Sequence, residues 1–110
     1  MVIAGDITIV ADRRAEMLQA VAPYVADTRN EDGCIAYSLS ADPVDDDRVL
    51  VLEIWASTEQ LAVHMGGSTI ADMGAAIAPF RPKGGKLMKY RVDASAPLYG
   101  PGGALSLDFE

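Results

Sequence analysis

Residues 49–64 read Val49-Leu-Val-Leu-Glu-Ile-Trp-Ala-Ser-Thr-Glu-Gln-Leu-Ala-Val-His64 and contain the only Trp and the only His of the chain. Residues 49–56 are aliphatic and β-branched with a single charge, Glu53, and this composition predicts a strand. Because apolar side chains fall on both of its faces, we expect the strand to be covered on both sides. Alternation along the strand places Glu53 and Trp55 on one face.

A helix is predicted directly after this strand. Ser57 is followed three residues later by Gln60, which is the spacing of a capping box at a helix N-terminus. Leu61, His64 and Met65 then recur at i, i+3 and i+4, so they form one stripe that faces the sheet. Strand and helix together predict one pocket between them, lined by Glu53, Trp55 and His64.

The other segments alternate between strand and helix patterns. We expect strands at 1–11, 34–41 and 86–93, a helix at 12–29 capped by Asp12, and a short helix at 68–78 capped by Ser68. The order βαββαβ predicts an α+β, ferredoxin-like fold, in which a four-stranded antiparallel sheet carries its helices on one face. The other face is then apolar and open, which favours a homodimer through that face.

The length and composition restrict the kind of protein that this chain can be. A chain of 110 residues with one Cys is expected to form one domain without an intramolecular disulfide, as in a cytoplasmic protein. The net charge of −7 argues against nucleic-acid and anionic-membrane partners. The sequence predicts neither a signal peptide nor a membrane span. Basic residues gather late in the chain and are interpreted as solvated charge, with an anion site as the alternative: Arg81, Lys83, Lys86, Lys89 and Arg91.

The last part of the chain differs from the rest in composition. Residues 94–103 contain two Pro and three Gly, and apolar residues alternate with polar ones at 105–109. We therefore divide the chain into a domain at 1–93 and a tail at 94–110. Leu105, Leu107 and Phe109 are expected to dock the tail, as an extra strand on the domain or across the dimer.

Four motifs, in their order and spacing, resemble the antibiotic biosynthesis monooxygenase (ABM) domain family: Thr28-Arg-Asn-Glu-Asp-Gly-Cys34, Tyr37, Glu53-Ile-Trp55 and His64. The resemblance spans residues 1–93. It implies a dimeric α+β barrel and a relation to cofactor-free oxygenases of aromatic polyketides, to quinol oxygenases and to haem-degrading enzymes. The haem-degrading relatives use an Asn in the first strand, whereas this strand offers Asp6, which argues against haem.

Candidate site residues follow from the resemblance and from side-chain chemistry. The catalytic candidates are His64, Trp55 and Tyr37, and the candidates for the substrate pocket are Glu53, Met65, Met73, Phe80 and Asp6. Five of them also have a purely structural interpretation: His64, Trp55 and Tyr37 as packed core residues, Glu53 as a paired carboxylate and Asp6 as a solvent-facing residue. One His and one Cys offer no metal-ligand spacing, and no glycine-rich fingerprint for a flavin or nicotinamide is present.

These groups suit a cofactor-free reaction. A deprotonated polyphenol or hydroquinone passes an electron to O₂ by itself, so the protein need only take the proton, hold the ring and exclude water. His64 is the expected base and Tyr37 the orienting donor. The alternatives are a non-catalytic dimeric ligand-binding module, an isomerase or cyclase with His64 as base, and a haem-degrading enzyme.

Overall fold

The structure is a computed structural model and describes residues 1–109. Four strands form one antiparallel sheet in the order β2-β3-β1-β4. Their bounds are β1 Val2–Thr8, β2 Cys34–Ala41, β3 Arg48–Trp55 and β4 Gly84–Tyr90. All four predicted strands are present, although the first and the last end three residues earlier than expected, at Thr8 and Tyr90. The strand β3 pairs with both β1 and β2.

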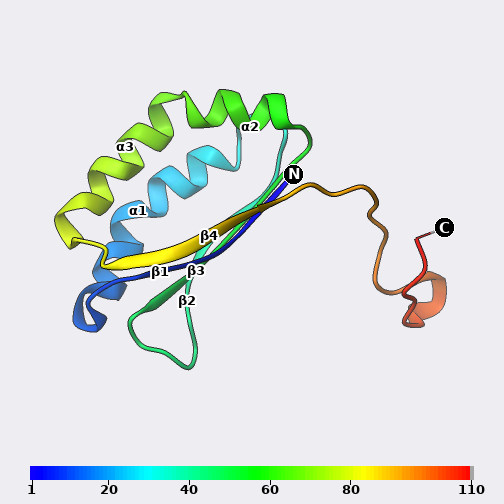
Figure 1. The fold of residues 1–110 in the computed structure, drawn as a ribbon, viewed down its shortest axis with the longest axis horizontal. Helices are drawn as coiled ribbons and strands as arrows, with labels where there is room; N and C mark the ends of the chain where they lie inside the picture. Colours follow the sequence, from blue (N-terminus) through cyan, green and yellow to red (C-terminus); the bar gives the residue numbers. More distant parts are fainter. Residues whose placement is uncertain (110) are drawn as a thin grey trace.

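All the longer helices lie on one face of the sheet (Figure 1). They are α1 Arg14–Thr28, α2 Thr58–Met65 and α3 Ser68–Ile77. This arrangement confirms the α+β, ferredoxin-like fold with an antiparallel sheet and helices on one face. Among the described residues, no helix is both long enough and apolar enough to span a bilayer.

The helix starts agree with the prediction in one case and differ in two. Ser57 caps α2 as expected, because its hydroxyl accepts the backbone N–H of Gln60 at 3.1 Å. Asp12, in contrast, is not the cap of α1: the chain already turns as a short 3₁₀ helix over Ala11–Arg13, and Arg13 precedes α1 without a side-chain cap. Gly67, rather than Ser68, precedes α3.

A close approach of β1 and β4 depends on glycine. Gly5 has φ +156°, and a Cβ atom at this position would meet the backbone carbonyl of Lys86 on the neighbouring strand. Gly85 on β4 has φ +143° and would meet the carbonyl of Asp6 in the same way. Both residues therefore allow the edge strand β4 to pair with β1, where a side chain would clash with the opposite backbone.

The core between sheet and helices consists of two clusters. One surrounds Trp55 and also contains Val21, Tyr37, Leu61 and Met73. The other contains Ile9, Met17, Val49 and Phe80. Both clusters use the face of β3 that carries the odd-numbered residues, so the alternation predicted for residues 49–55 is the one that builds the core.

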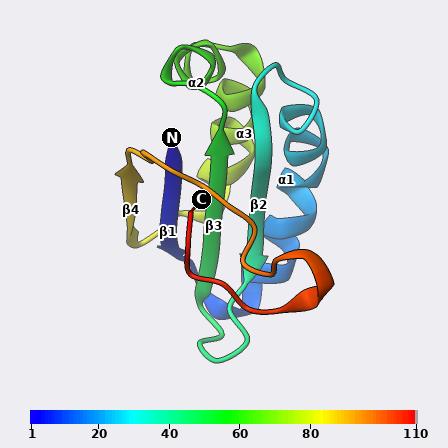
Figure 2. The same cartoon turned by 90° about the vertical axis from the view of Figure 1, so that its right-hand side faces the viewer.

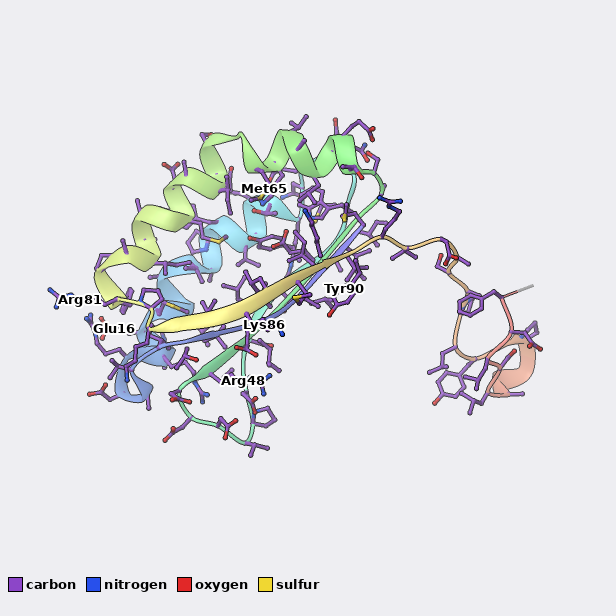
Figure 3. All side chains as sticks on the ribbon, viewed as in Figure 1. Glu16, Arg48, Met65, Arg81, Lys86 and Tyr90 are labelled. Atoms are coloured by element: carbon purple, nitrogen blue, oxygen red, sulfur yellow. The ribbon has the colours of Figure 1, made fainter. Side chains whose placement is uncertain are left out.

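The opposite face of the sheet is open. Leu52, Met88 and Tyr90 are exposed there, and Figure 3 shows Tyr90, Lys86 and Arg48 on the side away from the helices. Ile35 is also exposed, because a register shift between Cys34 and Ala36 takes it out of the alternation that places Tyr37 and Leu39 on the cavity side. The homodimer through this face stays a prediction.

The tail runs away from its own domain. After β4 it leaves the sheet on the side opposite the helices, and it passes in front of the open face in the second view (Figures 1 and 2). A bridge between Tyr99 and Leu105 and a 3₁₀ turn over Pro101–Gly103 fold it back on itself. Leu105, Leu107 and Phe109 are exposed. Their docking on a dimer partner stays a prediction, and Glu110 lies outside the described residues.

Candidate active site

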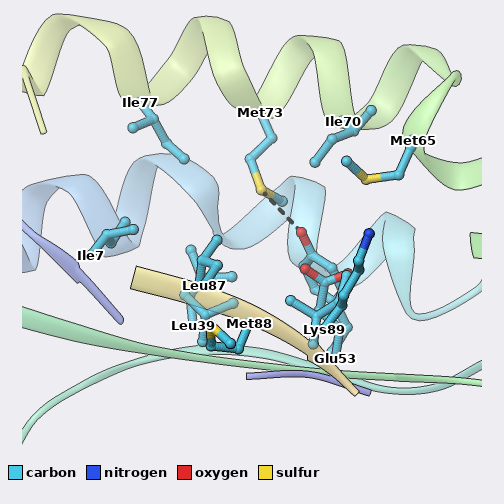
Figure 4. Close-up of a pocket in the computed structure, with 13 residues that line it drawn as sticks. Ile7, Leu39, Glu53, Met65, Ile70, Met73, Ile77, Leu87, Met88 and Lys89 are labelled. Carbon is cyan, nitrogen blue, oxygen red and sulfur yellow. Dashed lines mark hydrogen bonds between the residues drawn. The ribbon is translucent and has the colours of Figure 1, made fainter. Parts of the chain in front are cut away.

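A cavity of about 630 Å³ lies between the sheet and α3 (Figure 4). Its size is in the range of small-molecule sites. Most of its wall is aliphatic or Met side chains from the sheet and from the α2–α3 region: Ile3, Ile7, Leu39, Val51, Met65, Ile70, Met73, Ile77 and Leu87. Met88 borders the cavity at the edge strand, although its strand register is that of the open face. Three polar residues complete the lining, namely Tyr37, Glu53 and Lys89.

The three polar residues lie in one row across the sheet. In the strand register, Tyr37 of β2 lies opposite Glu53 of β3, Glu53 lies opposite Ile3 of β1, and Ile3 lies opposite Lys89 of β4. Side chains directly opposite one another in a sheet point to the same face. All three therefore enter the cavity at the same level, although they come from distant parts of the sequence.

Glu53 is buried and held by its neighbour on the same face of β3. Its Oε1 atom accepts the indole N–H of Trp55 at 3.1 Å, and only 7% of the residue is exposed. Because Trp55 follows two residues later, the alternation of the strand brings the two side chains together. The hydrogen bond satisfies both the buried indole and one carboxylate oxygen, and Glu53 also contributes to the cavity wall.

Tyr37 places a phenolic hydroxyl in the cavity wall. The hydroxyl donates to the Sδ atom of Met73 on α3 at 3.5 Å (Figure 4). Burial raises the pKa of Tyr37 well above its ordinary value, and the carboxylates of Glu53 and Glu31 raise this pKa further. Tyr37 is therefore a neutral hydrogen-bond donor and not a phenolate base.

His64 is completely buried behind the cavity wall. Its ring stacks on Trp55, with the centroids 4.7 Å apart, and meets the edge of Tyr37 at 5.5 Å. Nδ1 lies 2.9 Å from Oε2 of Glu31, and because a carboxylate accepts, Nδ1 carries the proton. Nε2 is buried and has no hydrogen-bond partner among residues 1–109. His64 is 1% exposed and does not contribute to the cavity wall.

The His64 ring borders a second hollow that is separate from the large cavity. A second hollow, of about 270 Å³, lies between the turn before β2 and helix α2, and its wall includes Glu31, Gln60 and His64. The side chain of Glu31 is 27% exposed. Glu31 therefore connects the imidazole to solvent, while Trp55 and Tyr37 separate it from the large cavity.

The predicted pocket residues divide into two groups. Met65, Met73, Glu53 and Tyr37 line the cavity, and their roles toward a substrate stay predictions. Trp55 and His64 lie directly behind its wall, in contact with the lining residues Glu53 and Tyr37, respectively.

Two predicted pocket residues lie elsewhere. Phe80 belongs to the second core cluster and carries the guanidinium of Arg13 over its ring at 4.5 Å. Asp6 points to the open face, where it pairs with Arg48 at 2.9 Å. Asp6 is excluded from the cavity by strand alternation, because the neighbouring odd-numbered residues Ile3 and Ile7 take the helix-facing side of β1.

Besides apolar lining residues, two charged residues at the site were not identified from the sequence, Lys89 and Glu31. Lys89 was grouped with the other late basic residues, and only the strand register separates it from Lys86, which lies opposite Asp6 on the open face. Glu31 belongs to the motif at 28–34 but has no pattern of its own that points to His64. Among residues 1–109, no three His, Cys, Asp or Glu side chains gather as a metal site requires.

Comparison with known proteins agrees with the fold and the residue pattern. The family model for antibiotic biosynthesis monooxygenase matches residues 1–76. An uncharacterized Synechocystis protein is 31% identical over 64 residues, which are 58% of this chain and 44% of that protein, so the chain spans less than half the length of this curated relative.

Solved structures share the architecture. A Deinococcus radiodurans protein provisionally named an antibiotic biosynthesis monooxygenase superimposes with a TM-score of 0.78 over 91% of this chain and 100% of its own, at 24% identity. A conserved Methanosarcina mazei protein gives a TM-score of 0.74 at 17% identity, over 82% of this chain and 89% of its own. At these identities the likeness concerns the fold alone, whereas the family model covers most of the sequence. This chain belongs to the antibiotic biosynthesis monooxygenase family.

Proposed function

We propose that the protein is a cofactor-independent monooxygenase that oxygenates a polyphenolic or hydroquinone-type aromatic molecule in the cavity of about 630 Å³. The observation that carries the proposal is the distribution of polarity in this cavity. An aliphatic and Met-rich wall suits flat aromatic rings, while Tyr37, Glu53 and Lys89 stand together in one row to contact the oxygens of such a molecule. A few polar groups in an apolar wall are typical of sites that orient a small molecule.

The reaction needs only the substrate and O₂. Removal of a phenolic proton gives a phenolate, which transfers one electron to O₂ and forms a ring radical and superoxide. The two recombine as a carbon-bound peroxide anion, which takes the removed proton back from the base to form the hydroperoxide, and loss of water leaves a quinone. A phenol and O₂ thus become a quinone and water: one oxygen atom enters the ring and the other leaves as water, with the substrate itself as the reductant.

The residues of the wall have separate roles in this proposal. Glu53 takes the phenolic proton, because its carboxylate is part of the cavity wall and the N–H of Trp55 holds it in place. Tyr37 donates to a second oxygen of the substrate, and Met65 and Met73 pack on the rings. His64, which was expected to be the base, becomes a positioning residue behind Tyr37 and Trp55.

The decisive experiment is dissolved-oxygen uptake by metal-free protein with a panel of hydroquinones and polycyclic phenols. We expect uptake with at least one of these compounds, and a loss of roughly 10²-fold in the Glu53→Gln variant, which keeps an acceptor for Trp55 but cannot take the proton. Asp6→Asn is the matched control, because Asp6 lies on the other face of the sheet. No uptake with any compound would contradict the proposal.

The second candidate function is ligand binding in the same cavity without catalysis. It is supported by His64, the single His of the chain, which does not line the cavity. It predicts binding of the same aromatic compounds without oxygen uptake. Calorimetric titration of a compound that gives no uptake separates the two functions.

A further inference from the structure

We propose that Lys89 is a substrate-binding residue that selects aromatic molecules carrying an anionic oxygen. The inference deepens the proposed function, from which it takes only the aromatic nature of the ligand. Lys89 is the one lining residue of the cavity with a cationic side chain. It stands on the edge strand β4, at the solvent-exposed side of the cavity.

The side chain of Lys89 is directed into the cavity. Figure 4 shows it rising from β4 toward Met65, beside Glu53. Lys86, three residues earlier, lies opposite Asp6 on the other face of the sheet. Strand alternation therefore separates Lys89 from Lys86: the side chain of Lys89 lies on the cavity face of β4 and that of Lys86 on the open face.

Within residues 1–109, no carboxylate forms an ion pair with Lys89. The carboxylate of Glu53 is two strands away in the same row, which corresponds to roughly 10 Å between the backbones. Its Oε1 atom is engaged by Trp55. The ammonium group of Lys89 is thus available to an anion that enters the cavity.

The row sets the orientation of the ligand. Ile3 lies between Glu53 and Lys89 and forms an apolar floor on which an aromatic ring rests. An anionic oxygen at one end of the ring meets Lys89, and a hydroxyl at the other end meets Glu53. Because the like charge of Glu53 disfavours an anion at its own end, the opposite signs of the two residues fix one direction of binding. The preferred ligand is a fused aromatic with a hydroxyl at one end and an anionic oxygen, a carboxylate or an acidic phenolate, at the other.

The test compares two isosteric probes under nitrogen, so that binding is measured without turnover. The probes are 6-hydroxy-2-naphthoate and its neutral counterpart 6-hydroxy-2-naphthamide, titrated calorimetrically into the full-length protein at neutral pH. We expect the acid to bind at least roughly tenfold more tightly than the amide. In the Lys89→Met variant this preference should fall to about one, with the affinity for the amide changed less than about twofold.

Two further variants serve as controls. Lys86→Met removes a neighbouring charge from the other face of the sheet and should leave the preference unchanged. Lys89→Arg keeps the charge and should retain most of the preference. Equal affinity of the unmodified protein for acid and amide, equal weakening of both by Lys89→Met, or binding of neither probe at millimolar concentration would each overturn the proposal. Selective binding without oxygen uptake would instead retain the role of Lys89 and contradict the monooxygenase function.

The source of the anionic charge is tested with a third probe. 2,6-Dihydroxynaphthalene, titrated across the ionisation of its first hydroxyl, separates a phenolate from a carboxylate preference. Tighter binding at a pH where one hydroxyl is ionised, abolished in Lys89→Met, assigns the site to aryl oxyanions in general. A preference confined to the naphthoate restricts it to aromatic carboxylates.

Discussion

The indole N–H of Trp55 donates a hydrogen bond of 3.1 Å to Oε1 of Glu53, two residues earlier on the same face of β3. This bond joins Trp55, which is 1% exposed, to the one carboxylate that residues 1–109 contribute to the cavity wall. The same two-residue alternation that satisfies the indole therefore also presents a carboxylate to the cavity.

The Trp55→Phe variant tests the structural part of this relationship. Phenylalanine retains an aromatic ring but leaves Oε1 of Glu53 without its donor and leaves a gap beside His64. We expect the free energy of unfolding to fall by roughly 2–4 kcal/mol, measured by urea denaturation followed by circular dichroism. Glu53→Gln is the matched variant, because its amide oxygen still accepts the indole N–H. A loss in Glu53→Gln as large as in Trp55→Phe would show that the charge, not the hydrogen bond, stabilises the strand.

Variants of the His64–Glu31 pair test whether His64 has a positioning role or a catalytic one. His64 is buried between Trp55 and Tyr37 and lies outside the cavity wall, so replacing it should chiefly cost stability. His64→Ala is expected to lose roughly 2–4 kcal/mol of unfolding free energy. Glu31→Gln, which keeps a hydrogen-bond acceptor at a partly exposed site, should lose less than about 1 kcal/mol.

Oxygen uptake by the folded His64→Ala protein distinguishes the two roles. A positioning residue predicts a reduction below roughly tenfold, because the imidazole does not touch the substrate. A reduction of roughly 10²-fold or more in kcat, with KM unchanged, would instead identify His64 as the base that the sequence suggested.

The raised pKa of Tyr37 predicts a stability change at alkaline pH. The phenol is buried in the folded protein and remains neutral there, whereas in the unfolded chain it ionises near pH 10. Its contribution to stability is therefore fully present below about pH 10 and is lost progressively as the pH rises further, because only the unfolded state releases the proton. We expect the urea midpoint of the natural protein to fall more steeply between about pH 9 and 11 than that of Tyr37→Phe. Identical slopes would contradict the burial of this hydroxyl.

The open face of the sheet predicts a homodimer. Leu52 is 42% exposed at the centre of this face, and a second sheet would bury it together with Met88 and Tyr90. Light scattering after size exclusion should give twice the chain mass of 11.6 kDa. Leu52→Glu should give the monomer mass, because it buries an unpaired charge in the interface. Val44→Glu, in the exposed turn between β2 and β3, is the matched control and should remain dimeric. A monomeric natural protein would contradict this prediction.

Local pattern was sufficient for the type of each element and for the order of the elements along the chain. The apolar alternation of residues 49–55, the capping pair Ser57 and Gln60, and the βαββαβ order led to the observed sheet and helices, because these signals act between residues that are close in the sequence. The same alternation also indicated that Glu53 and Trp55 share a face. The four motifs also indicated the family from local sequence, because each lies within a single element or turn.

Only the tertiary structure decided which residues enter the cavity. The position of Lys89 depends on the register of β4 against β1, and a shift of one residue would have sent its side chain to the open face and that of Met88 or Tyr90 inward. The seclusion of His64 depends on the packing of Trp55 and Tyr37 between α2 and the cavity, and its partner Glu31 is 33 residues away in the chain. Register and packing arise from contacts between distant segments, and a single sequence encodes them only through the free energy of the whole fold.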